Sequence, residues 1–91
     1  MIVVTGANGL IGANVVLALR DAGHGPLLHV DDYPALADAA EPADAPPENV
    51  RYERLDGVRY LHFEQLPAWL DRHGVAAGIT GIIHLGACSD T

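Results

Sequence analysis

Two short apolar runs near the start of this chain are separated by a stretch in which apolar residues recur at helical spacing. Residues 2–4 are β-branched without polar interruption, and residues 27–30, Leu-Leu-His-Val, form a second, largely apolar run. Uninterrupted runs of this length are typical of parallel strands that are covered on both faces. Between them, the spacing predicts one buried helical face, made of Ile11, Val15, Leu19 and Ala22. Gly23 and Pro26 are expected to end the helix, so residues 2–31 are predicted to form a β-α-β unit.

The second half of the chain continues the same rhythm. A third strand is predicted over residues 58–61 and a fourth within residues 81–86. Residues 64–72 are expected to form an amphipathic helix that points Leu66, Trp69 and Leu70 inward. The fold class predicted is therefore α/β: the N-terminal half of a Rossmann-type parallel sheet, with about four strands, flanking helices and strand order 3-2-1-4.

Residues 33–49 interrupt this rhythm with a stretch rich in alanine and acidic residues, divided by Pro34, Pro42, Pro46 and Pro47. Two structures fit it: a surface loop, or a short alanine-rich helix around residues 35–40 followed by a linker. The prolines favour the loop because they leave little room for paired helical turns. A loop of this length inside a small domain is usually functional or poorly ordered.

Composition narrows the class of protein. Ninety-one residues are enough for one small domain at most. Twelve acidic residues face five basic ones, all arginine, and a net charge of −7 argues against nucleic acid and anionic membranes as partners. The chain has a single cysteine, Cys88, which excludes an intrachain disulfide and favours a cytoplasmic protein. The first residues have neither signal-peptide nor transmembrane character.

A glycine-rich segment, Thr5-Gly6-Ala7-Asn8-Gly9-Leu10-Ile11-Gly12, lies between the first predicted strand and the first predicted helix. Gly6 allows a tight turn, Gly9 allows phosphates to approach the backbone, and Gly12 allows close helix packing. The helix N-terminus adds N–H donors and the positive end of the helix dipole. Asp31 ends the next strand, where an acid that binds a ribose is expected, although a strand-end cap is the alternative. These features predict a bound dinucleotide.

The spacing Gly-x-x-Gly-x-x-Gly is similar to that of the extended short-chain dehydrogenase/reductase family, whose members act mostly on nucleotide sugars. Residues 82–91, Ile-Ile-His-Leu-Gly-Ala-Cys-Ser-Asp-Thr, resemble the segment after the fourth strand of the ADP-glycero-manno-heptose 6-epimerases. His-x-Gly-Ala-Cys-Ser is distinctive there, and residues 1–12 are similar to the same family. The matching parts cover about half of the chain.

The resemblance implies an isomerase that epimerises C6 of an ADP-heptose for lipopolysaccharide core synthesis by transient oxidation. It also implies bound NADP and a homo-oligomer. Another nucleotide-sugar epimerase, dehydratase or reductase of the family is one alternative, and a non-catalytic NAD(P)-binding sensor is another. Carried over by position, Leu10 and Ile11 would cover the pyrophosphate, and Asp31 and Asp32 would face the adenosine ribose. The residues expected to line the cofactor after the fourth strand are Leu85, Gly86, Ala87, Cys88 and Ser89.

Two features depart from the family pattern. The family lysine that meets the 2′-phosphate is absent, and Arg51 is the expected substitute. Asp31 and Asp32 would favour NAD by charge, whereas the resemblance favours NADP, so NADP is expected with NAD as the alternative. The family's catalytic Tyr-x-x-x-Lys is also missing, because the sequence contains no lysine. Residues 1–91 are therefore expected to be the NAD(P)-binding segment alone, without the catalytic and sugar-binding part and without turnover.

No metal site and no nucleophile are predicted. The residues around Cys88 supply no base that would activate its thiol. The five histidines show no metal-ligand spacing with one another or with Cys88. His84 is expected at a strand end, near backbone or cofactor.

Overall fold

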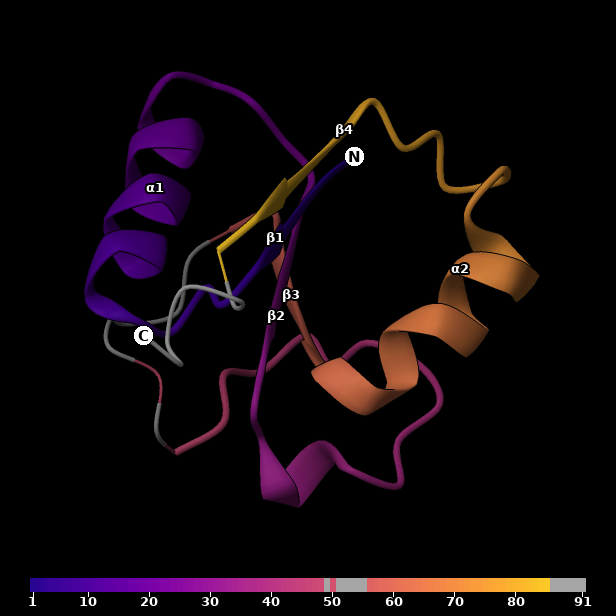
Figure 1. Cartoon of the computed structure of the whole chain (residues 1–91). Helices are drawn as coiled ribbons and strands as arrows, with labels where there is room; N and C mark the ends of the chain where they lie inside the picture. Colours follow the sequence, from indigo (N-terminus) through magenta and orange to yellow (C-terminus); the bar gives the residue numbers. More distant parts are fainter. Residues whose placement is uncertain (49, 51–55, 86–91) are drawn as a thin grey trace.

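Four parallel strands in the order β3-β2-β1-β4 form the centre of the computed structural model, which describes residues 1–48, 50 and 56–85 (Figure 1). The strands are β1 (Ile2–Thr5), β2 (Leu27–Asp31), β3 (Val58–His62) and β4 (Gly81–His84). β1 lies inside the sheet, with Ile2 opposite both Leu27 of β2 and Gly81 of β4. The predicted α/β class and the strand order 3-2-1-4 are confirmed.

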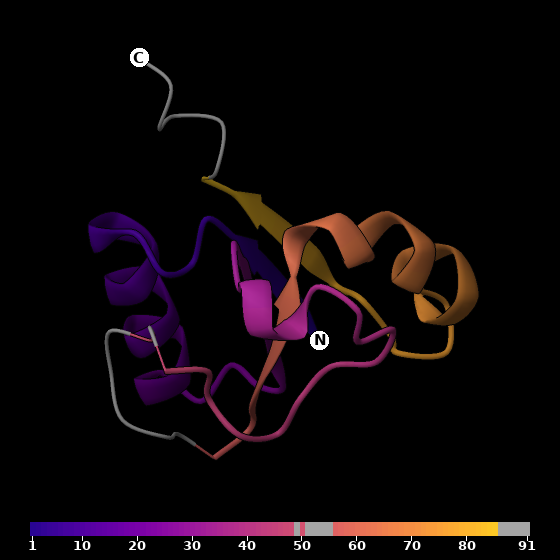
Figure 2. The ribbon, with the colours of Figure 1, turned by 90° about the horizontal axis from the view of Figure 1, so that it is seen from below.

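Two helices cover opposite faces of this sheet, α1 (Leu10–Asp21) and α2 (Leu66–His73) (Figures 1 and 2). Successive strand residues point to opposite faces. Val4 accordingly packs with Val16 of α1, whereas its neighbour Val3 packs with Trp69 of α2. All four residues of the predicted run 27–30 are buried, as expected for a strand covered on both sides.

The buried face of α1 is only partly the one predicted. Gly12, Ala13 and Val16 are buried, while Ile11 is 70% exposed and Ala22 is exposed. Val15 and Leu19, also expected inside, are only partly buried. The reason is the close approach of the helix at Gly12, which turns the face formed by Gly12, Ala13 and Val16 toward the sheet and leaves Ile11 outside.

Both helices end where the glycines predicted. Gly23 has a φ of +82°, and its N–H donates to the carbonyl of Arg20 after α1 ends. Gly74 follows α2 directly, and Pro67 lies in the first turn of that helix. A short 3-10 helix, η2 (Phe63–Gln65), precedes α2. Among the helices of the described residues, none has the length and apolar character needed to cross a membrane.

In its described residues, the connection from β2 to β3 contains a 3-10 turn, η1 (Pro34–Leu36), and no α-helix over residues 35–40. Its chain lies against β3 instead. Ala43 and Tyr60 exchange two backbone hydrogen bonds, of 2.8 and 2.9 Å. Arg59 donates to Asp44 at 3.1 Å. The segment therefore covers the outer edge of β3, which would otherwise expose unpaired backbone groups.

Candidate functional site

The glycine-rich segment forms a tight loop at the carboxyl end of β1. Gly6 has a φ of +66°, a conformation that glycine adopts without strain. The N–H of Ala7 donates to the carbonyl of Val30 at 3.1 Å, and the N–H of Gly9 donates to the carbonyl of Gly6 at 3.1 Å. The loop is thus held against the end of β2 before α1 begins.

The surrounding structure constrains Gly12 and Gly9 differently. A Cβ on Gly12 would lie 2.1 Å from the carbonyl oxygen of Gly6 and 2.8 Å from Cα of Ala7, so close packing requires glycine there. A Cβ on Gly9 would meet only the Gly6 oxygen at 3.4 Å, an ordinary contact. The backbone of Gly9 (φ −70°, ψ 169°) also suits any residue. Steric packing therefore requires glycine at position 12 but does not require it at position 9.

Gly9 is the N-cap of α1 and is exposed, and it offers no side-chain acceptor to the first turn. The first N–H groups of an α-helix have no carbonyl partner within the helix, and they carry the positive end of its dipole. Leu10 and Ile11 belong to this turn, and their side chains are 71% and 70% exposed. The exposed first turn therefore combines N–H donors with apolar surface.

Asp31 connects the end of β2 to the glycine loop. Its Oδ2 accepts the N–H of Asn8 at 2.7 Å, and its Oδ1 accepts the N–H of Asp32 at 2.6 Å. The carboxylate of Asp31 is half-buried, and the side chain of Asp32 is largely exposed. Asp31 thus does act as a strand-end cap, and a second role toward a ribose stays a prediction.

The strand order reverses between β1 and β4, and open α/β sheets bind ligands in the crevice at such a point. Thr5 ends β1 and His84 ends β4, and Oγ1 of Thr5 shares a hydrogen bond of 2.5 Å with Nδ1 of His84. The expected strand-end position of His84 is confirmed. Leu85 follows, donating its N–H to the carbonyl of Thr5 at 3.1 Å, and its side chain packs against the core beneath α1. The other predicted site residues, Arg51 and Gly86, Ala87, Cys88 and Ser89, lie outside the described residues.

A buried aromatic cluster lies beneath this edge and was not predicted. His29 of β2 is fully buried between the rings of Tyr33 and Tyr60, at centroid distances of 5.5 and 5.2 Å. The hydroxyl of Tyr33 is hydrogen-bonded to Nε2 of His29. Burial lowers the pKa of His29 from 6.5 to about 4, although the charge of Asp31 opposes the shift. Burial also raises the pKa of Tyr33, together with the charges of Asp31 and Tyr60. The signal for this cluster that the sequence offered was a histidine within the otherwise apolar run 27–30.

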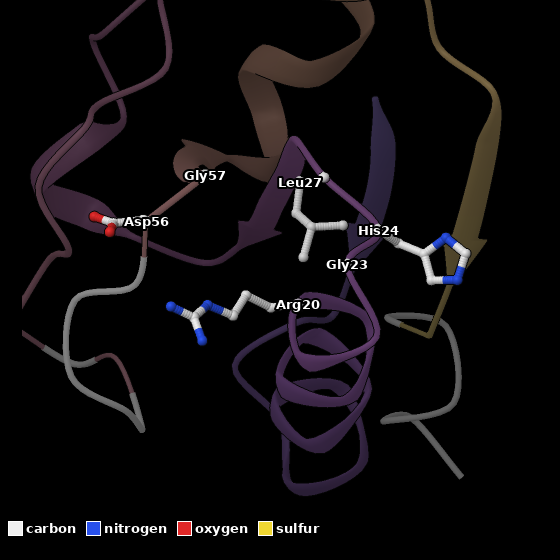
Figure 3. A pocket seen from close by; sticks show the side chains of 7 residues that line it. Arg20, Gly23, His24, Leu27, Asp56 and Gly57 are labelled. Carbon is white, nitrogen blue, oxygen red and sulfur yellow. The ribbon is translucent and has the colours of Figure 1, made fainter.

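Of the cavities that the described residues form, two lie at opposite ends of the parallel strands. The first cavity, of about 460 Å³, lies beside the segment that comes after Asp32. It is lined by Tyr33, Pro34, Ala35, Pro46, Pro47 and Glu48. The other, of about 160 Å³, lies at the amino end of β2, where Arg20, His24, Leu27 and Asp56 surround it (Figure 3). Only the first adjoins the carboxyl edge that carries the glycine loop.

No protein-family model matches this chain, and no solved structure matches it. Within residues 1–48, 50 and 56–85, no group of three His, Cys, Asp or Glu side chains is arranged to hold a metal ion. The candidate site therefore depends on its own geometry: a glycine loop, an exposed helix N-terminus and a carboxylate at the next strand end.

Proposed function

We propose that this chain binds an adenine dinucleotide at the carboxyl edge of its sheet. The observation that carries the proposal is the contrast at Gly9, an exposed N-cap without a side chain at a position where the fold would accept one. A phosphate that approaches the N–H groups of the first turn supplies a reason for glycine there.

The described residues fit the parts of such a ligand. The N–H groups that begin α1 would hold the pyrophosphate, with Leu10 and Ile11 covering it. Asp31 and Asp32 would accept hydrogen bonds from the adenosine ribose, and the proline-lined cavity after Asp32 offers space for the adenine. Leu85 and the residues that follow would line the far half of the cofactor. When bound, the nicotinamide of such a cofactor accepts and returns a hydride.

The choice between NADP and NAD depends on charge at the ribose. NADP is the cofactor that the family resemblance supports, and it requires a cation near the 2′-phosphate. The described arginines bind groups away from the ribose site. Arg59 forms an ion pair with Asp44, and Arg72 donates to the carbonyl of Ala40. Arg51 is proposed to meet the 2′-phosphate. Without it, the carboxylates of Asp31 and Asp32 would favour NAD.

The larger activity proposed is that of a nucleotide-sugar epimerase acting at C6 of an ADP-heptose, of which this chain forms the NAD(P)-binding part. The support is the similarity of residues 1–12 and 82–91 to that family. Because the chain holds no lysine, it cannot supply the Tyr-x-x-x-Lys pair, and no turnover is expected from it alone. In such an enzyme, the sugar-binding residues and the contacts of the homo-oligomer would be formed by other parts of the protein. A non-catalytic NAD(P) sensor is the second candidate, favoured by the same lack of a catalytic pair.

The test is calorimetric titration of the wild type and of Gly9→Val with NAD and NADP. The variant is expected to fold, because a Cβ at this position meets only the Gly6 oxygen, at 3.4 Å. It should nevertheless weaken binding at least about tenfold by covering the N–H groups. Leu17→Val, in the same helix but away from its first turn, is the control. Equal affinity of wild type and Gly9→Val, with both folded by circular dichroism, would contradict the proposal.

A further inference from the structure

His62 ends β3 directly beside the turn that follows β2. Its side chain is almost fully buried, and its Nδ1 accepts the backbone N–H of Tyr33 at 2.9 Å. A ring nitrogen that accepts carries no hydrogen, so Nε2 holds the proton of the neutral imidazole. Nε2 accordingly donates to Oε1 of Glu64 at 3.0 Å. Both ring nitrogens are therefore engaged, and the orientation of the imidazole is fixed.

Tyr33 is the residue through which this ring acts on the neighbouring turn. Its ring is buried at 1% exposure, and its hydroxyl is bonded to His29. Tyr33 directly follows Asp31 and Asp32, and Oδ1 of Asp32 lies 3.7 Å from Nδ1 of His62. At the other end of the turn, Asp31 accepts the N–H of Asn8 in the glycine loop. The turn that carries the two carboxylates is thus held by the glycine loop at Asp31 and by His62 at the N–H of Tyr33.

We infer that His62 is a positioning residue for the ribose-binding carboxylates, an inference that rests on the proposed function. By accepting the Tyr33 N–H, the imidazole fixes the direction in which Asp31 and Asp32 leave β2. Binding groups must be held to within about 0.5 Å by the residues behind them. Without an acceptor, a buried N–H is left unpaired, and the turn is expected to rearrange until it finds one.

Two substitutions at His62 separate this role from simple packing. In His62→Asn, the amide oxygen takes the place of Nδ1 and keeps an acceptor for Tyr33, although the contact with Glu64 is lost. In His62→Leu, the volume is kept roughly but both hydrogen bonds disappear. Leu61→Ala is the matched control, because Leu61 packs in the core on the α2 side of the same strand. Its destabilisation by cavity formation shows what a loss of stability alone does to binding.

The experiment measures the affinities for NAD and NADP by calorimetry and the exchange of the Asn8, Asp32 and Tyr33 amides by NMR. We expect His62→Leu to bind about five- to tenfold more weakly, the size of one lost hydrogen bond, with faster exchange at all three amides. His62→Asn should stay within about twofold of the wild type. Leu61→Ala should bind like the wild type under conditions in which it is folded.

Wild-type affinity in His62→Leu would overturn the inference, and so would an equal loss in His62→Asn or in Leu61→Ala. If the wild type binds neither dinucleotide, the proposed function fails on its own account. The amide exchange then decides the positioning role without a ligand, since unchanged exchange at Asn8 and Asp32 in His62→Leu shows that the turn does not depend on the imidazole.

Discussion

At the residue scale, the packing of α1 onto the glycine loop depends on one missing methyl group. Gly12→Ala would place a Cβ 2.1 Å from the Gly6 oxygen and 2.9 Å from its carbonyl carbon, and these backbone atoms cannot turn away as a side chain would. We expect the free energy of unfolding to fall by about 2–3 kcal/mol, as in other overpacked cores. Urea unfolding measures it, with Gly81→Ala as the control, since a Cβ at Gly81 meets no atom within 4 Å. Equal losses in the two variants would show that α1 adjusts to the methyl group.

The buried imidazole of His29 makes stability depend on pH. Its pKa is about 4 in the folded protein and 6.5 as the ordinary value, so the unfolded chain binds more protons between these limits. Stability is therefore fully present above pH 6.5 and falls as the pH drops toward 4, by on the order of 3 kcal/mol in total.

The measurement is the free energy of unfolding of wild type and His29→Gln at pH 7 and pH 4.5. The glutamine amide oxygen can replace Nε2 as the partner of the Tyr33 hydroxyl but takes up no proton in this range. Carboxylates titrate in both proteins, so the difference between the two pH profiles isolates His29. A wild-type profile as shallow as that of His29→Gln would mean that the imidazole is not the cause.

At the scale of elements, the features that follow from local pattern were predictable and those that depend on distant contacts were not. The strands and the helix ends follow from apolar runs and from glycine or proline, which act over a few residues. The buried face of α1 was predicted only in part. Val15 and Leu19 do pack against the core, but hydrophobic periodicity assigned Ile11 to the core and gave no sign that Gly12 forms the contact surface. The preference for a loop over an α-helix around residues 35–40 was correct. Its pairing of Ala43 with Tyr60 had no local signal.

The candidate site likewise has features that could be predicted from the sequence and features that could not. The glycine loop and Asp31 lie together as the motif predicts, since a β-α-β unit brings adjacent strand ends to one edge. The contact of Tyr33 with His62 joins residues 29 positions apart and exists only because β2 and β3 pair in register, with Asp31 opposite His62. Knowledge of strand order alone does not give that register, and so the residues that support the turn could not be named from the sequence.

At the scale of the whole molecule, the two edge strands of the sheet differ in whether another segment covers them. The segment carrying Ala43 covers the outer edge of β3, whereas β4 pairs with β1 on one side only within the described chain. The described strand β4, Gly81–His84, carries no carboxylate, although the chain as a whole has a charge of −7. Ile82 of this strand is 53% exposed. An uncharged edge strand with exposed β-branched surface is a template for pairing with another chain.

We therefore expect the protein to associate as its concentration rises, and Ile82→Lys to reduce this association, because a lysine on an edge strand disfavours edge-to-edge pairing. Light scattering over a concentration series measures the effect. Val75→Lys is the matched control, since Val75 is fully exposed and lies outside the strands. This substitution changes the net charge by the same amount as Ile82→Lys. If both lysines reduce association alike, net charge rather than the β4 edge is responsible, and a wild type that stays monomeric throughout the series would show that this edge does not pair.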